Sequence, residues 1–226
     1  MAKILVTGGA GFIGSHVAEA YLEGGHQVVI LDDLSSGQRE NIPAGAKFCE
    51  MDLRSPDLLA LFEQEKFDYV THLAAQIDVR RSVTDPLFDA DVNIRGGINL
   101  LEACIKAPIK KFLFASTGGA IYGEPEQLPA PETCPPRPKC QYATSKLSFE
   151  NYIGLYERLY GLRYCILRFP NVYGPRQRAD GEAGVCSILI GLMLDGRTPT
   201  LYGFGEPLRD YVFVGDIARG AVLALD

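Results

Sequence analysis

Tyr142 and Lys146 are the residues whose types and spacing first suggest chemistry. Residues four apart lie on one face of a helix. A lysine ammonium beside a phenol favours the phenolate, so Lys146 is expected to lower the pKa of Tyr142 from its usual value of about 10. The pair is therefore a candidate for proton transfer near neutral pH. Taken alone, the spacing also fits a helix without any chemistry.

A glycine-rich turn near the start of the chain gives this pair a context. Residues 4–6 are short, apolar and β-branched, which suits a buried parallel strand, and apolar residues then recur with helical spacing. The glycines between them fit either of two patterns, Gly9-x-Gly11-x-x-Gly14 or Gly8-x-x-Gly11-x-x-Gly14. Such a turn lets the backbone approach a pyrophosphate, at which the helix N-terminus then points.

Asp32 stands at the end of a second predicted strand, residues 27–31. In dinucleotide-binding units an acidic residue about 20 positions beyond the glycines hydrogen-bonds the adenosine ribose. The same carboxylate repels a 2′-phosphate, so the sequence favours NAD over NADP. The alternative is a strand-helix turn that binds no nucleotide, and the position of Asp32 argues against it.

Further motifs run along the whole chain. They are the glycine turn, Leu31-Asp32-Asp33-Leu34, Met51-Asp52-Leu53, His72-Leu73-Ala74-Ala75, Asn93, Ala115-Ser116-Thr117, Tyr142 to Lys146, Arg168 to Pro175 and Arg209 to Asp216. On these residues the chain resembles the extended short-chain dehydrogenase/reductase family, in its branch of NAD-dependent nucleotide-sugar epimerases and dehydratases. The resemblance implies NAD as cofactor, a UDP-sugar of the glucose and galactose type as substrate, and epimerisation at C4 as the reaction.

The resemblance also assigns an NAD site. Its residues would be Gly8, Gly11, Phe12, Ile13, Gly14, Asp32, Ser36, Gly37, Asp52, Leu53, Leu73, Ala74, Ala75, Gln76, Asn93, Tyr142 and Lys146. For residues 73–75 simple core packing is the alternative. Asn93 falls within a predicted helix, where it would either support the active site through hydrogen bonds or be solvated.

Thr117 is the implied third catalytic residue, with Ser116 as the second choice. In the epimerase pattern a hydroxyl after the fifth strand bonds the reacting oxygen of the sugar. Related 4,6-dehydratases carry an Asp-Glu pair directly after this threonine, as acid and base. Here Gly118-Gly119 follow instead. Because neither can transfer a proton, the sequence favours epimerisation over dehydration.

The resemblance implies roles for these side chains. Tyr142 as phenolate would take the proton of the sugar 4-hydroxyl while hydride leaves C4 for the nicotinamide. Lys146 would hold the nicotinamide ribose and, together with the positive nicotinamide ring, lower the pKa of Tyr142. Thr117 would orient the oxygen. The 4-keto sugar would rotate and take hydride back on its other face, so that the cofactor stays bound.

A substrate site is implied as well, formed by Thr117, Asn171, Val185, Tyr202 and Arg209. Arg209 can bind a diphosphate through two parallel hydrogen bonds. An ion pair with Asp210 or Asp216 is its alternative. Arg176, in a polar loop, is expected to be solvated.

Composition excludes several other classes of protein. The 226 residues carry a formal charge of −6, which argues against a nucleic acid or an anionic membrane as partner. The longest apolar stretch, residues 185–194, is too short to span a bilayer. The six cysteines form no C-x-x-C pair and have no histidine at metal-ligand spacing, which predicts reduced thiols and no metal site. The first predicted strand leaves no room for a signal peptide, so a cytoplasmic location is expected.

The elements that must position these residues alternate between strand and helix. Strands are predicted at about residues 4–6, 27–31, 47–49, 69–74, 111–115 and 163–169, and helices from residue 12, over 55–64, over 85–106 and from Tyr142 to Tyr160. Such alternation predicts an α/β fold with a doubly wound parallel sheet. Beyond residue 170 the pattern loosens. We expect a helix over 187–194, short strands at 200–201 and 211–214, and a last helix capped by Asp216.

This pattern divides the chain into two parts. Residues 1–170 form an NAD-binding Rossmann domain on which residues 210–226 pack back, and residues 171–209 form a partial substrate-binding region. Family members run on past this point, so a C-terminal part of the family fold is expected to be absent and the substrate lobe incomplete. Family members are commonly homodimers through a four-helix contact, here formed by the helix from Asp85 and the helix of Tyr142.

Two other functions stay open. One is a related sugar-nucleotide enzyme, such as a uronate or hexosamine epimerase or a decarboxylase. The other is a truncated NAD-binding module without turnover. The joint presence of Tyr142, Lys146 and Thr117 favours catalysis, because a silent module needs none of the three.

Overall fold

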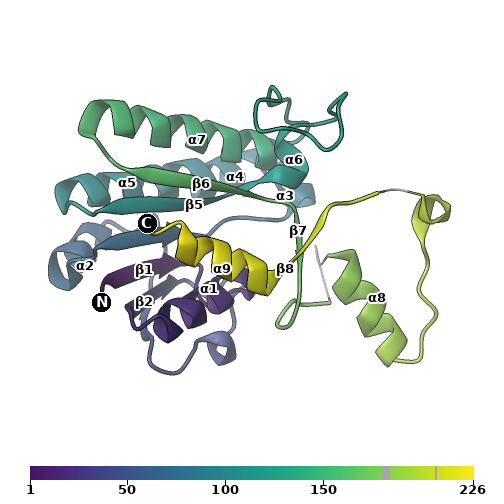
Figure 1. The fold of residues 1–226 in the computed structure, drawn as a ribbon, viewed down its shortest axis with the longest axis horizontal. Coiled ribbons are helices and arrows are strands. Elements are labelled where there is room, and N and C mark those ends of the chain that lie inside the picture. The colour runs from purple at the N-terminus through teal and green to yellow at the C-terminus, as the bar shows by residue number, and fades with distance from the viewer. Residues whose placement is uncertain (180–183, 207) are drawn as a thin grey trace.

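The computed structural model describes residues 1–179, 184–206 and 208–226 and shows an α/β fold (Figure 1). In these parts of the chain six strands form one parallel sheet in the order β3-β2-β1-β4-β5-β6. The strands are β1 (Lys3–Thr7), β2 (Gln27–Asp32), β3 (Lys47–Glu50), β4 (Tyr69–His72), β5 (Lys111–Thr117) and β6 (Tyr164–Phe169). The order reverses between β1 and β4, and doubly wound sheets bind ligands at this switch point. The predicted fold class is confirmed.

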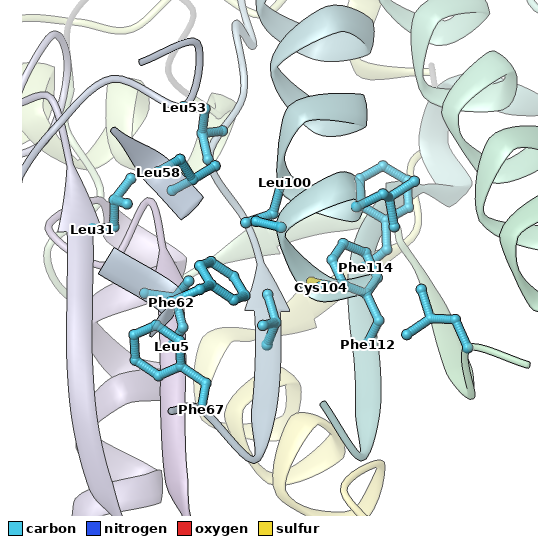
Figure 2. Close-up of a cluster of buried hydrophobic side chains, with 14 of the residues drawn as sticks. Leu5, Leu31, Leu53, Leu58, Phe62, Phe67, Leu100, Cys104, Phe112 and Phe114 are labelled. Atoms are coloured by element: carbon cyan, nitrogen blue, oxygen red, sulfur yellow. The ribbon is translucent and has the colours of Figure 1, made fainter. Parts of the chain in front are cut away.

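Both faces of the sheet are covered by helices. One face carries α2 (Leu58–Glu65), α5 (Gly97–Lys106) and α7 (Gln141–Tyr160), and the other carries α1 (Phe12–Glu23) and α9 (Val214–Leu223). Successive strand residues point to opposite faces. Leu5 and Leu31 therefore join Phe62 in one core (Figure 2), while Ile4 and Ile30 join the other. Each fully buried side chain of this size contributes about 1.5–3 kcal/mol.

The helix predicted over residues 85–106 forms in three consecutive pieces. These are α4 (Pro86–Ala90), the π-helical turn η2 (Asp91–Gly96) and α5. The helix starts at the predicted place, and Asp85 caps it, since its carboxylate accepts a hydrogen bond from the backbone N–H of Phe88 at 3.2 Å. Gly97 allows close packing, because a Cβ there would lie 2.4 Å from Cε2 of Phe149 on α7. The π turn was not predicted, and such turns often mark functional positions.

Short elements also differ from prediction. Two helices were not predicted, α3 (Val79–Thr84) and α6 (Gly118–Ile121). They are too short to show an apolar period. α3 begins behind Asp78, whose carboxylate accepts a hydrogen bond from the N–H of Arg81 at 2.8 Å. α2 begins at Leu58 rather than at Ser55, which instead accepts a hydrogen bond from the N–H of Asp57 at 3.1 Å.

The last part of the chain holds a second, two-stranded parallel sheet of β7 (Asn171–Tyr173) and β8 (Tyr211–Phe213). α8 (Val185–Leu194) stands apart from the main sheet and has no buried residue (Figure 1). The prediction of a strand at residues 200–201 is wrong: these residues form no strand, and the 3₁₀ turn η3 (Tyr202–Gly205) follows them. α9 begins at Val214, so Asp216 lies in its first turn and does not cap it. α9 packs beside α1, where the Tyr21 hydroxyl donates to the carbonyl of Ala221 at 3.3 Å.

Candidate active site

The glycine turn joins β1 to α1 at the switch point of the sheet. Gly8 has a φ of +70°, and a Cβ there would lie 2.6 Å from the backbone nitrogen of Ala74. A Cβ on Gly14 would lie 2.1 Å from the carbonyl oxygen of Gly8. Gly11 is the N-cap of α1 and Phe12 and Ile13 form its first turn. Only glycines give this backbone, so the turn forms the cradle that a pyrophosphate needs at a helix N-terminus.

Asp32 lies beside this turn at the end of β2, with its side chain buried. Its two carboxylate oxygens accept hydrogen bonds from the N–H groups of Ala10 at 3.0 Å and Leu34 at 2.9 Å. Burial raises the pKa of Asp32, and the two backbone hydrogen bonds offset part of this effect. A Cβ on Gly37 would lie 2.8 Å from Asp32 Oδ1, so Gly37 leaves the carboxylate room, while Ser36 is exposed. The buried carboxylate is thus fixed beside the glycine turn by backbone hydrogen bonds.

Residues 73–76, which follow β4, line the other side of the turn. The N–H groups of Leu73 and Ala74 reach the carbonyl and the hydroxyl of Thr7 at 3.1 and 3.2 Å. Ala75 is half-buried and Gln76 is buried. This segment is fixed to β1 by hydrogen bonds and is more than core filling.

Asn93 lies in the π turn and is buried, so the solvated alternative does not hold. Its side-chain oxygen accepts from the N–H of Gln76 at 2.9 Å, and its nitrogen donates to the Gln76 carbonyl at 3.0 Å. This reciprocal pair holds the segment after β4 in place. The hydrogen-bonding support expected of Asn93 is therefore present.

Asp52 and Leu53 follow β3 and differ in their surroundings. Nε of Arg54 donates to Asp52 Oδ1 at 2.9 Å, and the arginine also pairs with Asp91 at 2.7 Å. The hydrogen bonds from Arg54 hold the pKa of Asp52 below its usual range. Leu53 is buried in the core (Figure 2). The engagement of the Asp52 carboxylate by Arg54 was not predicted.

Lys146 lies on α7 with Nζ 5.9 Å from the ring centroid of Tyr142. The side chain is buried, and its ammonium donates to the carbonyl of Ala115 in β5 at 2.9 Å. Burial lowers the pKa of Lys146 to about 8, and the carboxylates of Asp89 and Glu150 oppose this shift. The two residues therefore share one face of the helix, as the spacing predicts.

The phenol of Tyr142 does not follow the expectation for its pKa. Burial, together with the negative charge of Asp89, raises the pKa of Tyr142 to about 12. The expected lowering by Lys146 is absent in this chain, because loss of hydration opposes the phenolate more strongly. The half-buried phenol thus requires added positive charge before it can act as a base near neutral pH.

Thr117 ends β5 next to this pair, and Ser116 precedes it; both are buried. The hydroxyl of Ser116 has no hydrogen-bond partner within the described residues, and that of Thr117 makes no capping bond to α6. A Cβ on Gly118 would lie 2.9 Å from the carbonyl oxygen of Arg168, so β6 excludes any larger residue there.

Asp89 and Ser145 were missed from the sequence. Both are buried, and Ser145 Oγ donates to Asp89 Oδ2 at 2.6 Å. One signal was present: Asp89 stands four residues before Asn93, which places the two side chains on one helix face. Asn93 Nδ2 donates to Asp89 Oδ1 at 3.0 Å, and this hydrogen bond joins the π turn to α4.

The predicted substrate residues are less closely gathered. Asn171 Nδ2 donates to the Asp210 carbonyl at 3.0 Å, and the exposed Arg209 donates to the carbonyl of Leu208 at 2.8 Å. Val185 is the exposed first residue of α8. Tyr202 belongs to η3, and its side chain lies outside the described part of the structure.

Arg176 was expected to be solvated, but it contacts α1. Its guanidinium donates to Glu19 at 2.8 Å and to the hydroxyl of Ser15 at 3.3 Å, both on α1. The ion pair thereby joins the segment after β7 to the Rossmann layer. Across the described residues, His, Cys, Asp and Glu form no group of three or more that could hold a metal ion. No helix among them is long and apolar enough to cross a membrane.

Comparison with known proteins agrees with this geometry. Residues 4–226 match the NAD dependent epimerase/dehydratase family. The UDP-glucose 4-epimerase of Mycolicibacterium smegmatis is 44% identical over an alignment that covers 98% of this chain and 72% of that protein. The solved UDP-glucose 4-epimerase of Thermotoga maritima with UDP-glucose has 48% identity and a TM-score of 0.97, covering 99% of this chain and 73% of that one. That of Thermus thermophilus in complex with NAD has 50% identity and a TM-score of 0.94, covering 99% and 74%. This chain belongs to the NAD-dependent epimerase/dehydratase family.

Proposed function

We propose that this chain catalyses the NAD-dependent epimerisation of a UDP-sugar of the glucose and galactose type at C4, through a 4-keto intermediate. The observation that carries the proposal is the placement of Tyr142 and Lys146 on one buried face of α7 at the end of β5. Gly118 and Gly119 provide no second acid or base there. One proton acceptor with a reversible hydride acceptor is sufficient for epimerisation but not for elimination of water.

The residues fit the cofactor that the family name specifies. The cradle of Gly8, Gly11 and Gly14 would hold the pyrophosphate at the N-terminus of α1, and Asp32 would hold the adenosine ribose. NAD, when bound, supplies a reversible hydride acceptor at C4. The remaining NAD contacts that we propose are Phe12, Ile13, Ser36, Gly37, Asp52, Leu53, Leu73, Ala74, Ala75, Gln76 and Asn93.

The chain's own residues then move and hold the proton. Tyr142 would accept the proton of the sugar 4-hydroxyl and return it after the ketone has turned. Lys146 would keep its ammonium close to the phenol, which lowers the cost of the phenolate. Thr117, or Ser116 in its place, would donate a hydrogen bond to the same oxygen. For the rest of the substrate we propose Asn171, Val185, Tyr202 and Arg209.

We also propose how the chain is divided and assembled. Residues 1–170, with 210–226, would form the NAD-binding domain, and residues 171–209 a part of the substrate region. The outer face of α7 exposes Tyr152, Leu155 and Leu159. An apolar stripe of this kind supports a homodimer in which α7 and the α4–α5 helix of two copies form a four-helix contact. We place the protein in the cytoplasm.

The test uses purified protein with UDP-galactose or UDP-glucose. We expect interconversion in both directions, with the absorbance of bound NAD returning to its start after turnover. Retained NAD without interconversion of either sugar would identify an NAD-binding module instead. Turnover limited to UDP-linked uronates or hexosamines would move the assignment to a related sugar-nucleotide enzyme.

A further inference from the structure

Asp89 is a carboxylate buried in the centre of the molecule that the proposed chemistry does not use. Its side chain is 0% exposed. In the described part of the chain it accepts hydrogen bonds from three neutral side chains. Oδ1 accepts from Gln76 Nε2 and Asn93 Nδ2, each at 3.0 Å, and Oδ2 accepts from Ser145 Oγ at 2.6 Å.

These three partners come from three different elements. Gln76 belongs to the segment after β4, Asn93 to the π turn and Ser145 to α7, directly before Lys146. Asp89 therefore joins the segment that lines the glycine cradle to the helix that carries the proton-transfer pair. Hydrogen bonds to an ionised carboxylate are stronger than those between neutral groups, so the segment after β4 and α7 would lose their register without Asp89.

Neutral donors alone leave the charge of Asp89 without a counter-charge, which is costly for a buried group. A candidate is the buried ammonium of Lys146, which stands one residue beyond Ser145. Its own hydrogen bond goes to the carbonyl of Ala115, which is neutral. The carboxylate of Asp89 raises the pKa of Lys146 and thereby opposes the effect of burial. The two buried charges thus compensate each other across the helix.

We propose that Asp89 is a positioning residue that fixes α7 against the segment after β4 and holds Lys146 in its ammonium form. The contribution of Asp89 to catalysis rests on the proposed function of Tyr142 and Lys146. Asp89 touches neither cofactor nor substrate in this assignment and acts through Ser145 and Lys146. After burial, the negative charge of Asp89 is the next cause that raises the pKa of Tyr142.

Other titratable groups also face Lys146 and Tyr142. Lys146 also faces two other groups, Glu150 on its own helix and His72 of β4. Glu150 is paired with Arg168 of β6 at 2.6 Å. Burial and the Lys146 charge lower the pKa of His72 to about 3, so His72 is neutral at working pH. Tyr142 also faces the thiol of Cys140. Of these groups, Asp89 alone both bonds the residue before Lys146 and carries a charge without an ionic partner in the contacts described.

The test measures the pKa of Lys146 by NMR in the full chain with carbon-13-labelled lysine, assigned with Lys146→Arg. Neither substrate nor activity is needed, so a failed epimerase assay leaves the result standing. Asp89→Asn keeps the shape and can still bond Gln76, Asn93 and Ser145, but it removes the charge. We expect the pKa of Lys146 to fall from about 8 by roughly one unit.

Two control variants separate charge from packing. Ser145→Ala keeps the charge of Asp89 and removes its bond to α7, so the pKa of Lys146 should stay within a few tenths of the parent. Asp57→Asn removes an exposed carboxylate and should have no effect. An unchanged pKa in Asp89→Asn, or an equal fall in Asp57→Asn, would overturn the proposal.

A stability cycle covers a variant that folds poorly. If Asp89 compensates the charge of Lys146, then Asp89→Asn should cost less in a Lys146→Met background than in the parent, as read from thermal unfolding. If Asp89→Asn folds only in the Lys146→Met background, the proposal is supported, because the uncompensated ammonium is then absent. Equal cost in both backgrounds, or loss of folding in both, would assign Asp89 a purely structural role.

Discussion

At the residue scale, the pKa values of the two main groups of the site are shifted away from each other. Burial raises the pKa of Tyr142 to about 12 and lowers that of Lys146 to about 8. At neutral pH the pair is therefore a phenol beside an ammonium. Phenolate formation must come from charge that arrives with ligands, which suits a base that should act only on bound substrate.

Replacing Tyr142 by Phe tests this assignment at a single atom. The proton acceptor is lost while the ring and its packing remain, so we expect kcat to fall by about 10²–10⁴-fold or more. NAD should stay bound, as checked by its absorbance after gel filtration. Activity close to that of the parent would exclude Tyr142 as the base.

Gly118 provides a second prediction at this scale. A Cβ at position 118 would lie 2.9 Å from the Arg168 carbonyl oxygen, whereas one on Gly119 would have its nearest neighbour, Asn171 Nδ2, at 3.9 Å. Gly118→Ala should therefore lower the free energy of unfolding by about 1–3 kcal/mol, because β6 must move. Gly119→Ala is the matched control and should unfold in denaturant like the parent. Equal midpoints for the two variants would contradict the steric argument.

At the element scale, what the sequence predicted depended on local pattern. The six strands of the main sheet and α1, α5 and α7 follow from apolar runs and helical spacing that each segment shows by itself. β7 could not be predicted, because three residues are stable as a strand only through pairing with β8, far along the chain. The hydrogen bonds of Asp89 to Gln76 and Ser145 likewise depend on residues far along the chain. The engagement of Asp52 by Arg54, two residues on, depends on a side-chain conformation that the sequence pattern does not specify.

Glu65 joins elements in a way that depends on pH. From the end of α2 its buried carboxylate pairs with Lys3 of β1 and Lys47 of β3, each at 2.5 Å. Hydrogen bonds from these lysines hold the pKa of Glu65 below its usual range. A carboxyl with a lowered folded-state pKa adds stability above its unfolded value, about 4.3, and loses it as the pH falls through the folded value.

Glu65→Gln should accordingly destabilise the protein at neutral pH and much less in acid. We expect its melting temperature to lie roughly 2–4 °C below that of the parent at pH 7, with the gap closing below about pH 4. Glu63→Gln, on the exposed side of α2, is the control and should track the parent throughout. A gap that persists unchanged into acid would mean that shape, not charge, accounts for the role of Glu65.

At the scale of the whole molecule, packing is uneven along the chain. The Rossmann layers hold both cores, whereas α8 exposes Val185, Ile190, Met193 and Leu194. The chain spans 73% of the Thermotoga relative's length. Among the described residues, those proposed for the substrate have the fewest buried contacts. Their placement was also the least predictable part of the site from the sequence.

The proposed dimer gives the prediction that belongs to this scale. Leu155 and Leu159 are one turn apart on the outer face of α7 and are 38% and 60% exposed. A carboxylate at Leu155 would have to be buried against the same face of the second copy, at a cost of several kcal/mol. Leu155→Glu should therefore sediment as a monomer with unchanged helix content, while the parent sediments as a dimer. Ile190→Glu on α8 is the matched control, since it adds the same charge at an exposed apolar position outside the four-helix contact. If Ile190→Glu dissociates the dimer and Leu155→Glu does not, the copies meet through α8 and the four-helix arrangement is wrong.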